Sequence, residues 1–176
     1  MIETAAVIEL LGKLKDLKRS GWVMKKVSAP ESVADHSWGV ALLAVLLTPE
    51  GLDGHKCLQL AIVHDLQESI VGDITPADGI GREEKSRRER AAVGFLAEKL
   101  NFPELKALFE EFEALETPEA RFVKDLDRIE AVLQARYYDM TQRSPEKLVP
   151  EFSAYAEKNL CSGEKAIAEI LKKLDG

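Results

Sequence analysis

The residues best suited to chemistry gather in one short stretch, 60–76, which reads LAIVHDLQESIVGDITP. An apolar run carries the adjacent pair His64 and Asp65, Glu68 follows one helical turn later, and Asp73 lies in a glycine-containing turn. Imidazole and carboxylate groups bind divalent metals and carry protons. Burying such groups without partners is costly, so we expect them to be paired with one another or bound to a metal.

The three histidines of the chain differ in their surroundings. His55 stands beside Lys56 at the start of a helical pattern, and we predict it at the surface. His36 lies on an otherwise apolar helix face, where a lone histidine is more often a core residue with a satisfied hydrogen bond. His64 is also embedded among apolar residues, and Asp65 beside it is rarely buried unpaired. Two embedded histidines and an adjacent aspartate favour a metal site.

A further acidic ligand is expected from another helix, and the segment 122–130, FVKDLDRIE, offers the best candidates. Asp127 shares a helix face with Glu130 and lies four residues after an apolar position. Asp125 is its competitor. A solvated stripe of charges is the alternative interpretation of all these acids, and it is the usual one for acids on a helix.

The elements that must position these residues are predicted to be helices. Apolar residues recur three and four positions apart, and no convincing alternating strand is present. The length of 176 residues corresponds to one domain. We therefore predict an all-α, single-domain fold over 1–176. The predicted helices cover 2–17, 32–47, 54–70, 82–100, 103–115, 117–140, 150–159 and 163–174.

Composition excludes several classes of function. The net charge of −7 argues against binding to nucleic acid polymers or anionic membranes, although it does not exclude a small phosphorylated ligand. The sequence has no apolar run of about 18 residues, so no transmembrane helix is expected. Cys57 and Cys161 are isolated, and segment 1–19 does not read as a signal peptide. We expect a cytoplasmic protein.

The order His36, then His64-Asp65, then Asp127 resembles the signature of HD-domain metal-dependent phosphohydrolases. The segments LKRSGW, PESVADHS, HDLQESIVGDITPAD, EEKSRRE and KDLDRIEAVLQA are similar to those of HD-domain 5'-deoxynucleotidases. The HD dipeptide alone is a weak signal, whereas the full set in order is specific. The resemblance implies an HD-type helical bundle, often a homodimer, with a core at about 14–140 on which C-terminal helices pack.

The resemblance also implies the roles of individual residues. The metal ligands it assigns are His36, His64, Asp65 and Asp127, and the catalytic acids are Glu68 and Asp73. A mixed set of nitrogen and oxygen ligands suits one divalent metal such as Mn²⁺, Co²⁺ or Mg²⁺, and zinc is also compatible. One acid would orient or deprotonate water and the other would protonate the leaving oxygen or bind the sugar; the sequence does not divide these roles.

Arg19 and Trp22 are the predicted substrate-binding residues. In part of the family an arginine directly precedes a tryptophan in the substrate loop, whereas here Ser20 and Gly21 separate the two. The arginine would meet phosphate, and the indole would pack on a sugar or base. The implied function is metal-dependent hydrolysis of deoxyribonucleoside 5'-monophosphates to deoxynucleoside and phosphate. The alternatives are an HD-type phosphohydrolase of another nucleotide (triphosphate, cyclic or alarmone) and a non-catalytic helical scaffold.

Overall fold

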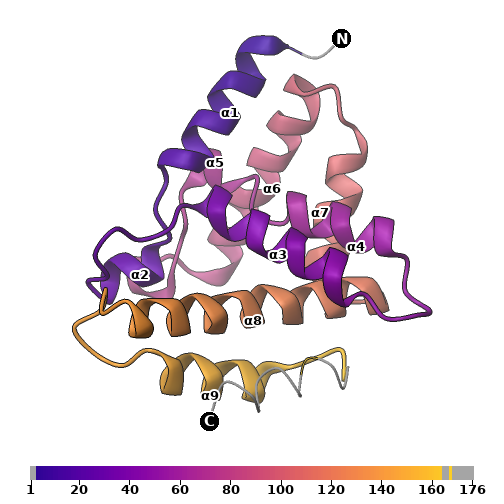
Figure 1. Cartoon of the computed structure of the whole chain (residues 1–176). Helices are drawn as coiled ribbons and strands as arrows, with labels where there is room; N and C mark the ends of the chain where they lie inside the picture. The colour runs from indigo at the N-terminus through magenta and orange to yellow at the C-terminus, as the bar shows by residue number, and fades with distance from the viewer. Residues whose placement is uncertain (1–2, 164–166, 168–176) are drawn as a thin grey trace.

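The computed structural model describes residues 3–163 and 167, and in these residues the all-α prediction is confirmed (Figure 1). Within the described residues, backbone pairing of the β type is limited to one isolated antiparallel bridge, between Lys18 and Ser32. The helices are α1 (Thr4–Asp16), α2 (Ser20–Met24), α3 (Val33–Leu47), α4 (Gly54–Val63), α5 (Glu68–Val71), the 3-10 helix η1 (Pro76–Asp78), α6 (Arg82–Lys99), α7 (Glu104–Ala114), α8 (Pro118–Met140) and α9 (Val149–Asn159).

The two helices that carry most of the site begin at strong N-caps. The hydroxyl of Ser32 accepts a hydrogen bond from the backbone N–H of Asp35, and the Asp35 carboxylate accepts one from the N–H of Ser32. Such a reciprocal capping box satisfies two donors that the first turn of α3 leaves free. Thr117 caps α8 by accepting from the N–H of Ala120, and Pro118 follows at the first helical position.

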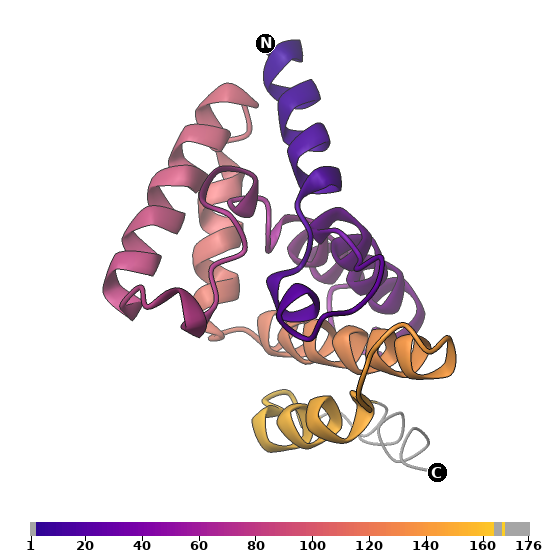
Figure 2. The same ribbon diagram turned by 90° about the vertical axis from the view of Figure 1, so that its left-hand side faces the viewer.

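Helices α3, α4 and α8 pack against one another and form the centre of the molecule. Helix α8 lies between α9 and the other helices in both views (Figure 1 and Figure 2). Its inward face is fully buried, as is the facing side of α4. The apolar side chains that meet there include Leu60, Phe122, Leu126 and Ile129. Residues far apart in the sequence are thereby brought to one place between the three helices.

The predicted helix over 54–70 is wrong in extent, because α4 ends at Val63 and α5 begins at Glu68. Backbone hydrogen bonds to the third residue back dominate the intervening turn. The N–H of Glu68 bonds to the carbonyl of Asp65 at 3.1 Å, and the N–H of Ile70 bonds to the carbonyl of Gln67 at 3.0 Å. Such tight winding brings side chains three apart into line, so Asp65 and Glu68 share a face.

The segment after α1, predicted to be irregular, contains the short helix α2, which buries Trp22. The sequence assigns Trp38, two residues after His36, to packing, and this prediction is wrong, because Trp38 is 69% exposed on α3. His55 is exposed, as predicted. The predicted helix over 163–174 lies outside the described residues apart from residues 163 and 167, and the single domain over 1–176 stays a prediction.

No described helix is long and apolar enough to cross a membrane.

Candidate metal and catalytic site

Two buried imidazole rings face each other between α3 and the end of α4. The Nε2 atoms of His36 and His64 are 3.4 Å apart. The Nδ1 of His64 lies 2.8 Å from the carbonyl oxygen of Ala61, and the Nδ1 of His36 lies 2.6 Å from Oε2 of Glu130. Both partners are acceptors, so each Nδ1 acts as the donor, and the Nε2 atoms of the two rings point toward the same space.

Two carboxylates complete this cluster. Oδ2 of Asp65 lies 3.2 Å from Nε2 of His64 and 3.9 Å from Nε2 of His36. Oδ1 of Asp127 lies 3.1 Å from Nε2 of His36. Ligand atoms of His36, His64 and Asp65 all lie within 4.8 Å of one another. Two imidazole nitrogens and two carboxylates thus converge on one space, and this set of nitrogen and oxygen atoms fits a divalent cation.

The electrostatics of the described chain also indicate a demand for positive charge. Burial and Arg19 lower the pKa of His36, but the carboxylates of Asp127 and Glu130 outweigh them and raise it to about 9. Burial raises the pKa of Asp127, yet Lys124 and His36 hold it well below its ordinary range. The cluster is therefore stabilised by cationic charge placed between its carboxylates.

The sequence left Asp125 and Asp127 as competitors, and the structure places them on different faces of α8. Asp125 is fully buried and accepts hydrogen bonds from the N–H groups of Cys161 and Ser162 at 3.0 and 2.7 Å. It also pairs with the guanidinium of Arg128 at 2.9 Å. Asp127 alone of the two contacts a histidine of the cluster, so Asp125 anchors the segment after α9.

Glu68 is nearly buried, with 8% of its surface exposed. Its Oε2 has no hydrogen-bond partner among the residues that the structure describes. Burial raises the pKa of this carboxyl to about 10, and the negative charges of Asp65 and Asp73 add to the shift. Positive charge in the cluster would oppose the shift. A buried carboxyl with a free oxygen is a common feature of catalytic sites.

Asp73 and Arg19 are linked through the start of α2. The backbone N–H of Ser20 donates to Oδ2 of Asp73 at 2.6 Å, and the Ser20 hydroxyl donates to its carbonyl at 2.8 Å. This double contact holds Arg19 over the cluster, where its guanidinium lies 3.2 Å from Asp65 and 4.0 Å from Asp127. The structure thus brings Arg19 to the site, and its contact with substrate stays a prediction.

Trp22 is placed differently from Arg19. Its side chain is 2% exposed, stacks on Phe152 with ring centroids 4.5 Å apart, and meets Tyr138 edge-on. Its indole N–H donates to Oε1 of Glu31 at 2.6 Å. These contacts favour a packing role, so the predicted contact between Trp22 and the substrate stays without support from this geometry.

Sequence reasoning missed two residues at the site. Lys124 lies 2.9 Å from Oδ2 of Asp127 and stacks over the Phe112 ring at 4.9 Å. Glu130 supports the outer nitrogen of His36. Both stand three positions from Asp127 on α8, so helical spacing placed them on its face. Their spacing from Asp127 is visible in the sequence, but charged residues on a solvent-exposed helix face show the same spacing.

The cationic side chains in the first turns of α6 have other partners. Arg87 and Arg88 both pair with Glu84 on the exposed side of α6. Lys85 donates to the carbonyl of Ile74 and so supports the loop that follows α5. These contacts leave Arg19 and Lys124 as the cations of the described chain that border the cluster.

Comparison with known proteins agrees with this arrangement. The family model described as HD domain matches residues 11–167. The 5'-deoxynucleotidase HDDC2 of Xenopus laevis is 43% identical over 154 residues, covering 86% of this chain and 77% of that protein. The 5'-deoxynucleotidase hdd1 of Schizosaccharomyces pombe is 39% identical over 139 residues, covering 75% and 70%. A conserved hypothetical protein from Pyrococcus furiosus superposes with a TM-score of 0.79 at 34% identity, covering 98% of both chains.

Proposed function

The chain belongs to the HD domain family, and we propose that it is a metal-dependent 5'-deoxynucleotidase. In the reaction, an oxygen of water forms a bond to phosphorus while the bond from phosphorus to the 5'-oxygen breaks. The products are a deoxynucleoside and inorganic phosphate. The observation that carries the proposal is the convergence of two imidazoles and two carboxylates beside the partly unsatisfied carboxyl of Glu68.

The proposed metal ligands are His36, His64, Asp65 and Asp127. Mn²⁺, Co²⁺ or Mg²⁺ suits this set of nitrogen and oxygen atoms, and Zn²⁺ is also compatible. When bound, a divalent cation lowers the pKa of water and offsets the charge of a phosphate. The chain's own contribution is the geometry: the hydrogen bonds at both Nδ1 atoms orient the rings before any cation arrives.

Glu68 and Asp73 are the proposed proton carriers. The free Oε2 of Glu68 can orient the attacking water or accept its proton. Asp73 lies on the loop after α5 and uses Oδ2 to hold Ser20, which leaves Oδ1 for the leaving 5'-oxygen or the sugar. A proton must reach that leaving oxygen as its bond to phosphorus breaks. Both assignments of base and acid remain compatible with these positions.

The proposed phosphate contacts are Arg19 and Lys124. Their side chains border the cluster from α2 and α8, and each already pairs with a carboxylate there. Two cations on different elements can hold a dianionic phosphate in a fixed orientation, and such positioning is a large part of phosphoryl transfer catalysis. The substrate would be a small nucleotide rather than a polymer, in keeping with the net charge of −7.

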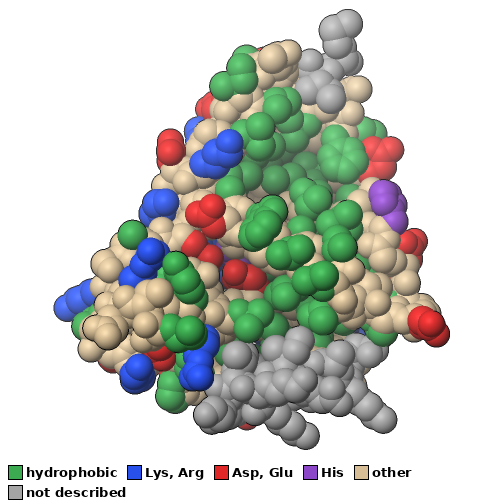
Figure 3. Space-filling model, in the orientation of Figure 1, with side chains coloured by type: hydrophobic (Ala, Val, Ile, Leu, Met, Phe, Trp, Pro, Cys, Tyr) green, Lys and Arg blue, Asp and Glu red, His purple; other side chains and the backbone are tan. Residues whose placement is uncertain are grey.

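We propose further that the protein is a cytoplasmic homodimer that associates through an apolar face. Hydrophobic side chains gather between α1 and α6 and along α3 in the view of Figure 3. The exposed apolar side chains on α1, α3, α4, α5 and α6 include Ile8, Leu11, Leu42, Val45, Leu46, Ile62, Ile70 and Phe95. Patches of this kind on soluble proteins mark interaction sites. Both cysteines are free, in keeping with a reducing compartment.

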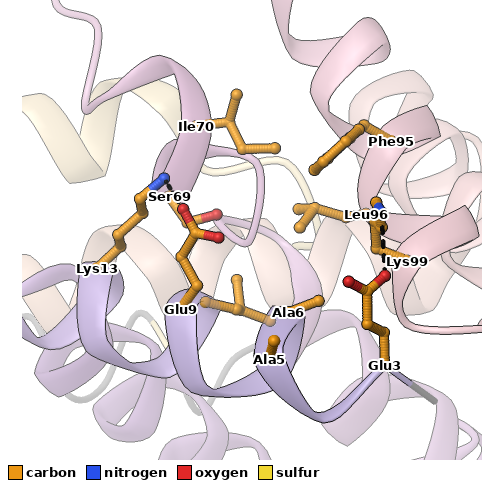
Figure 4. A pocket seen from close by; sticks show the side chains of 11 residues that line it. Glu3, Ala5, Ala6, Glu9, Lys13, Ser69, Ile70, Phe95, Leu96 and Lys99 are labelled. Carbon is orange, nitrogen blue, oxygen red and sulfur yellow. Dashed lines mark hydrogen bonds and ion pairs between the residues drawn. The ribbon is translucent and has the colours of Figure 1, made fainter.

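A hollow of about 450 Å³ lies within this apolar face, between α1, α5 and α6 (Figure 4). Leu10, Ile70 and Leu96 form part of its apolar lining, and ion pairs such as Glu3 with Lys99 stand at its rim. It contains none of the proposed metal ligands, so we assign it to association between copies. The molar mass in solution tests this: Val45→Glu should convert a dimer to a monomer, and a natural protein that is already monomeric would refute it.

The proposed function is tested with a substrate panel. Purified protein, stripped with a chelator and given back single metals, should release phosphate from deoxyribonucleoside 5'-monophosphates and work more slowly on the matching ribonucleotides. Activity that survives without metal would refute the role of the cluster. Preferential cleavage of triphosphates, cyclic nucleotides or alarmones would refute the proposed substrate.

A further inference from the structure

The outer side of His36 is supported by one carboxylate from α8. Glu130 places Oε2 2.6 Å from Nδ1 of His36, on the side of the ring that faces away from His64 and Asp127. The Glu130 residue is 8% exposed, and its side chain reaches this nitrogen from α8 beside Gly39 of α3. A carboxylate in this position fixes which ring nitrogen carries the proton and how the ring is turned.

Gly39, one turn after His36 on α3, provides the space for that carboxylate. A Cβ atom at this position would lie 2.8 Å from Oε1 and 2.9 Å from Cγ of Glu130, which is closer than non-bonded atoms approach. Glycine inside a helix is less favourable than alanine. The contact with Glu130 gives a physical reason for a glycine in the middle of α3.

We propose that Gly39 and Glu130 act as a positioning pair that orients His36 and thereby sets the metal affinity of the site. The proposal rests on the metal-dependent function proposed above. Glu130 is a positioning residue and not a ligand, because it contacts the nitrogen that points away from the cluster. Gly39 acts through Glu130, since its only contribution is the absence of a side chain.

A second cation held by Glu31, His36 and Glu130 is the competing interpretation, because ligand atoms of these three also lie within 4.8 Å of one another. The contacts argue against it. Oε2 of Glu130 and Nδ1 of His36 are 2.6 Å apart, which suits a shared proton, whereas two ligands at about 2 Å from one ion lie farther apart than that. Oε1 of Glu31 already accepts from the indole N–H of Trp22.

The test measures binding of Mn²⁺ by calorimetry to protein stripped with a chelator. Glu130→Gln preserves the volume of the side chain and removes its charge, and we expect roughly 10–100-fold weaker binding. Gly39→Ala should weaken binding to a similar degree by displacing the Glu130 carboxylate. Gly94→Ala on α6 is the matched control, because its new methyl would meet only the flexible end of Lys106 at 3.8 Å. That control should bind as tightly as the natural protein.

The double variant Gly39→Ala/Glu130→Ala separates steric displacement from general damage to the helix. If Gly39 acts only through Glu130, the double variant binds Mn²⁺ as tightly as Glu130→Ala alone, within about twofold. At saturating Mn²⁺, kcat of Glu130→Gln should return to within a few-fold of the natural value.

Four results would overturn the positioning pair. They are unchanged affinity in Gly39→Ala, losses that multiply in the double variant, a lowered melting temperature as the sole effect of Glu130→Gln, and two ions bound per natural chain of which Glu130→Ala loses one. If the natural chain binds no Mn²⁺, the proposed metal site fails as well. If Mn²⁺ binds tightly to every variant, only the positioning pair fails.

Discussion

Asp125 and Asp127 lie two positions apart on α8, and their side chains meet different parts of the molecule. Asp125 meets donors only: two backbone N–H groups after α9 and the guanidinium of Arg128. Asp127 meets Lys124 and also His36, on a face where further carboxylates and imidazoles converge. On the first face the Asp125 carboxylate meets hydrogen-bond donors alone. On the second face the Asp127 carboxylate meets Lys124 and also lies beside further nitrogen and oxygen atoms able to bind a cation.

The difference separates polar groups that hold the fold from polar groups arranged for chemistry. A satisfied buried carboxylate stabilises the structure that surrounds it. A cluster of acceptors such as that around His64 raises the energy of the fold unless positive charge is added, and folds tolerate such clusters mainly at functional sites. The residue type is the same in the two places and the side chains differ little in exposure (0% for Asp125 and 15% for Asp127), so the partners tell them apart.

The comparison is tested most strongly by removing the same group from each face. Asp127→Asn should lower kcat by roughly a thousandfold, because it removes a proposed metal ligand and the charge it places at the phosphate. Asp125→Asn should leave kcat within a few-fold but lower the free energy of unfolding by about 3 kcal/mol, because Arg128 and two N–H groups lose a buried anion.

Steady-state kinetics and urea unfolding at one temperature measure both effects. The two faces would not differ in the way described if Asp125→Asn lost turnover as severely as Asp127→Asn while remaining folded.

A second prediction concerns the acid that lies beside the cluster. Glu68→Gln should lower kcat by roughly a hundredfold, because the amide cannot accept a proton, while Mn²⁺ affinity stays close to the natural value. Glu89→Gln is a suitable control, since Glu89 on α6 is exposed to the same 8% and pairs with Lys85. Parallel loss of metal and turnover in Glu68→Gln would make Glu68 a ligand instead.

A smaller effect is expected at the rim of the site. Arg19→Ala should raise KM by about 10–100-fold, which corresponds to the 1.5–3 kcal/mol of a charge-assisted hydrogen bond, with a lesser change in kcat. Lys25→Ala is the control, because Lys25 pairs with Glu146 and Glu151 away from the cluster. An unchanged KM in Arg19→Ala would reduce its role to holding Asp65 in place.

Helical periodicity was sufficient for most of the helices, and the family resemblance named four residues that the structure places close together. Helical periodicity marks which side chains face inward, and the spacing of His64-Asp65 and Asp127 is distinctive. It was not sufficient for the break at 64–67, because the apolar spacing continues through the tightened turn. Nor could it separate Asp125 from Asp127, whose partners come from distant segments.

The site's supporting residues were also beyond the reach of the sequence. The contact of Glu130 with His36 depends on how α8 crosses α3. The reason for a glycine at position 39 can be inferred only once that crossing is known. The indole of Trp22 could equally have faced a ligand, and only the packing against Phe152 and Tyr138 shows its surroundings. The apolar periodicity of a helix indicates on which face a residue lies, but not which residue of another helix it contacts.

The central claim is that four side chains hold one divalent cation while Glu68 stands beside it. Crystals of the natural chain soaked in Mn²⁺ test this most directly through anomalous diffraction. We predict one anomalous peak per chain at about 2.0–2.3 Å from Nε2 of His36, Nε2 of His64 and a carboxylate oxygen of both Asp65 and Asp127, with Glu68 outside bonding distance. A peak elsewhere in the molecule, or one bonded to Glu68 in place of Asp127, would contradict it.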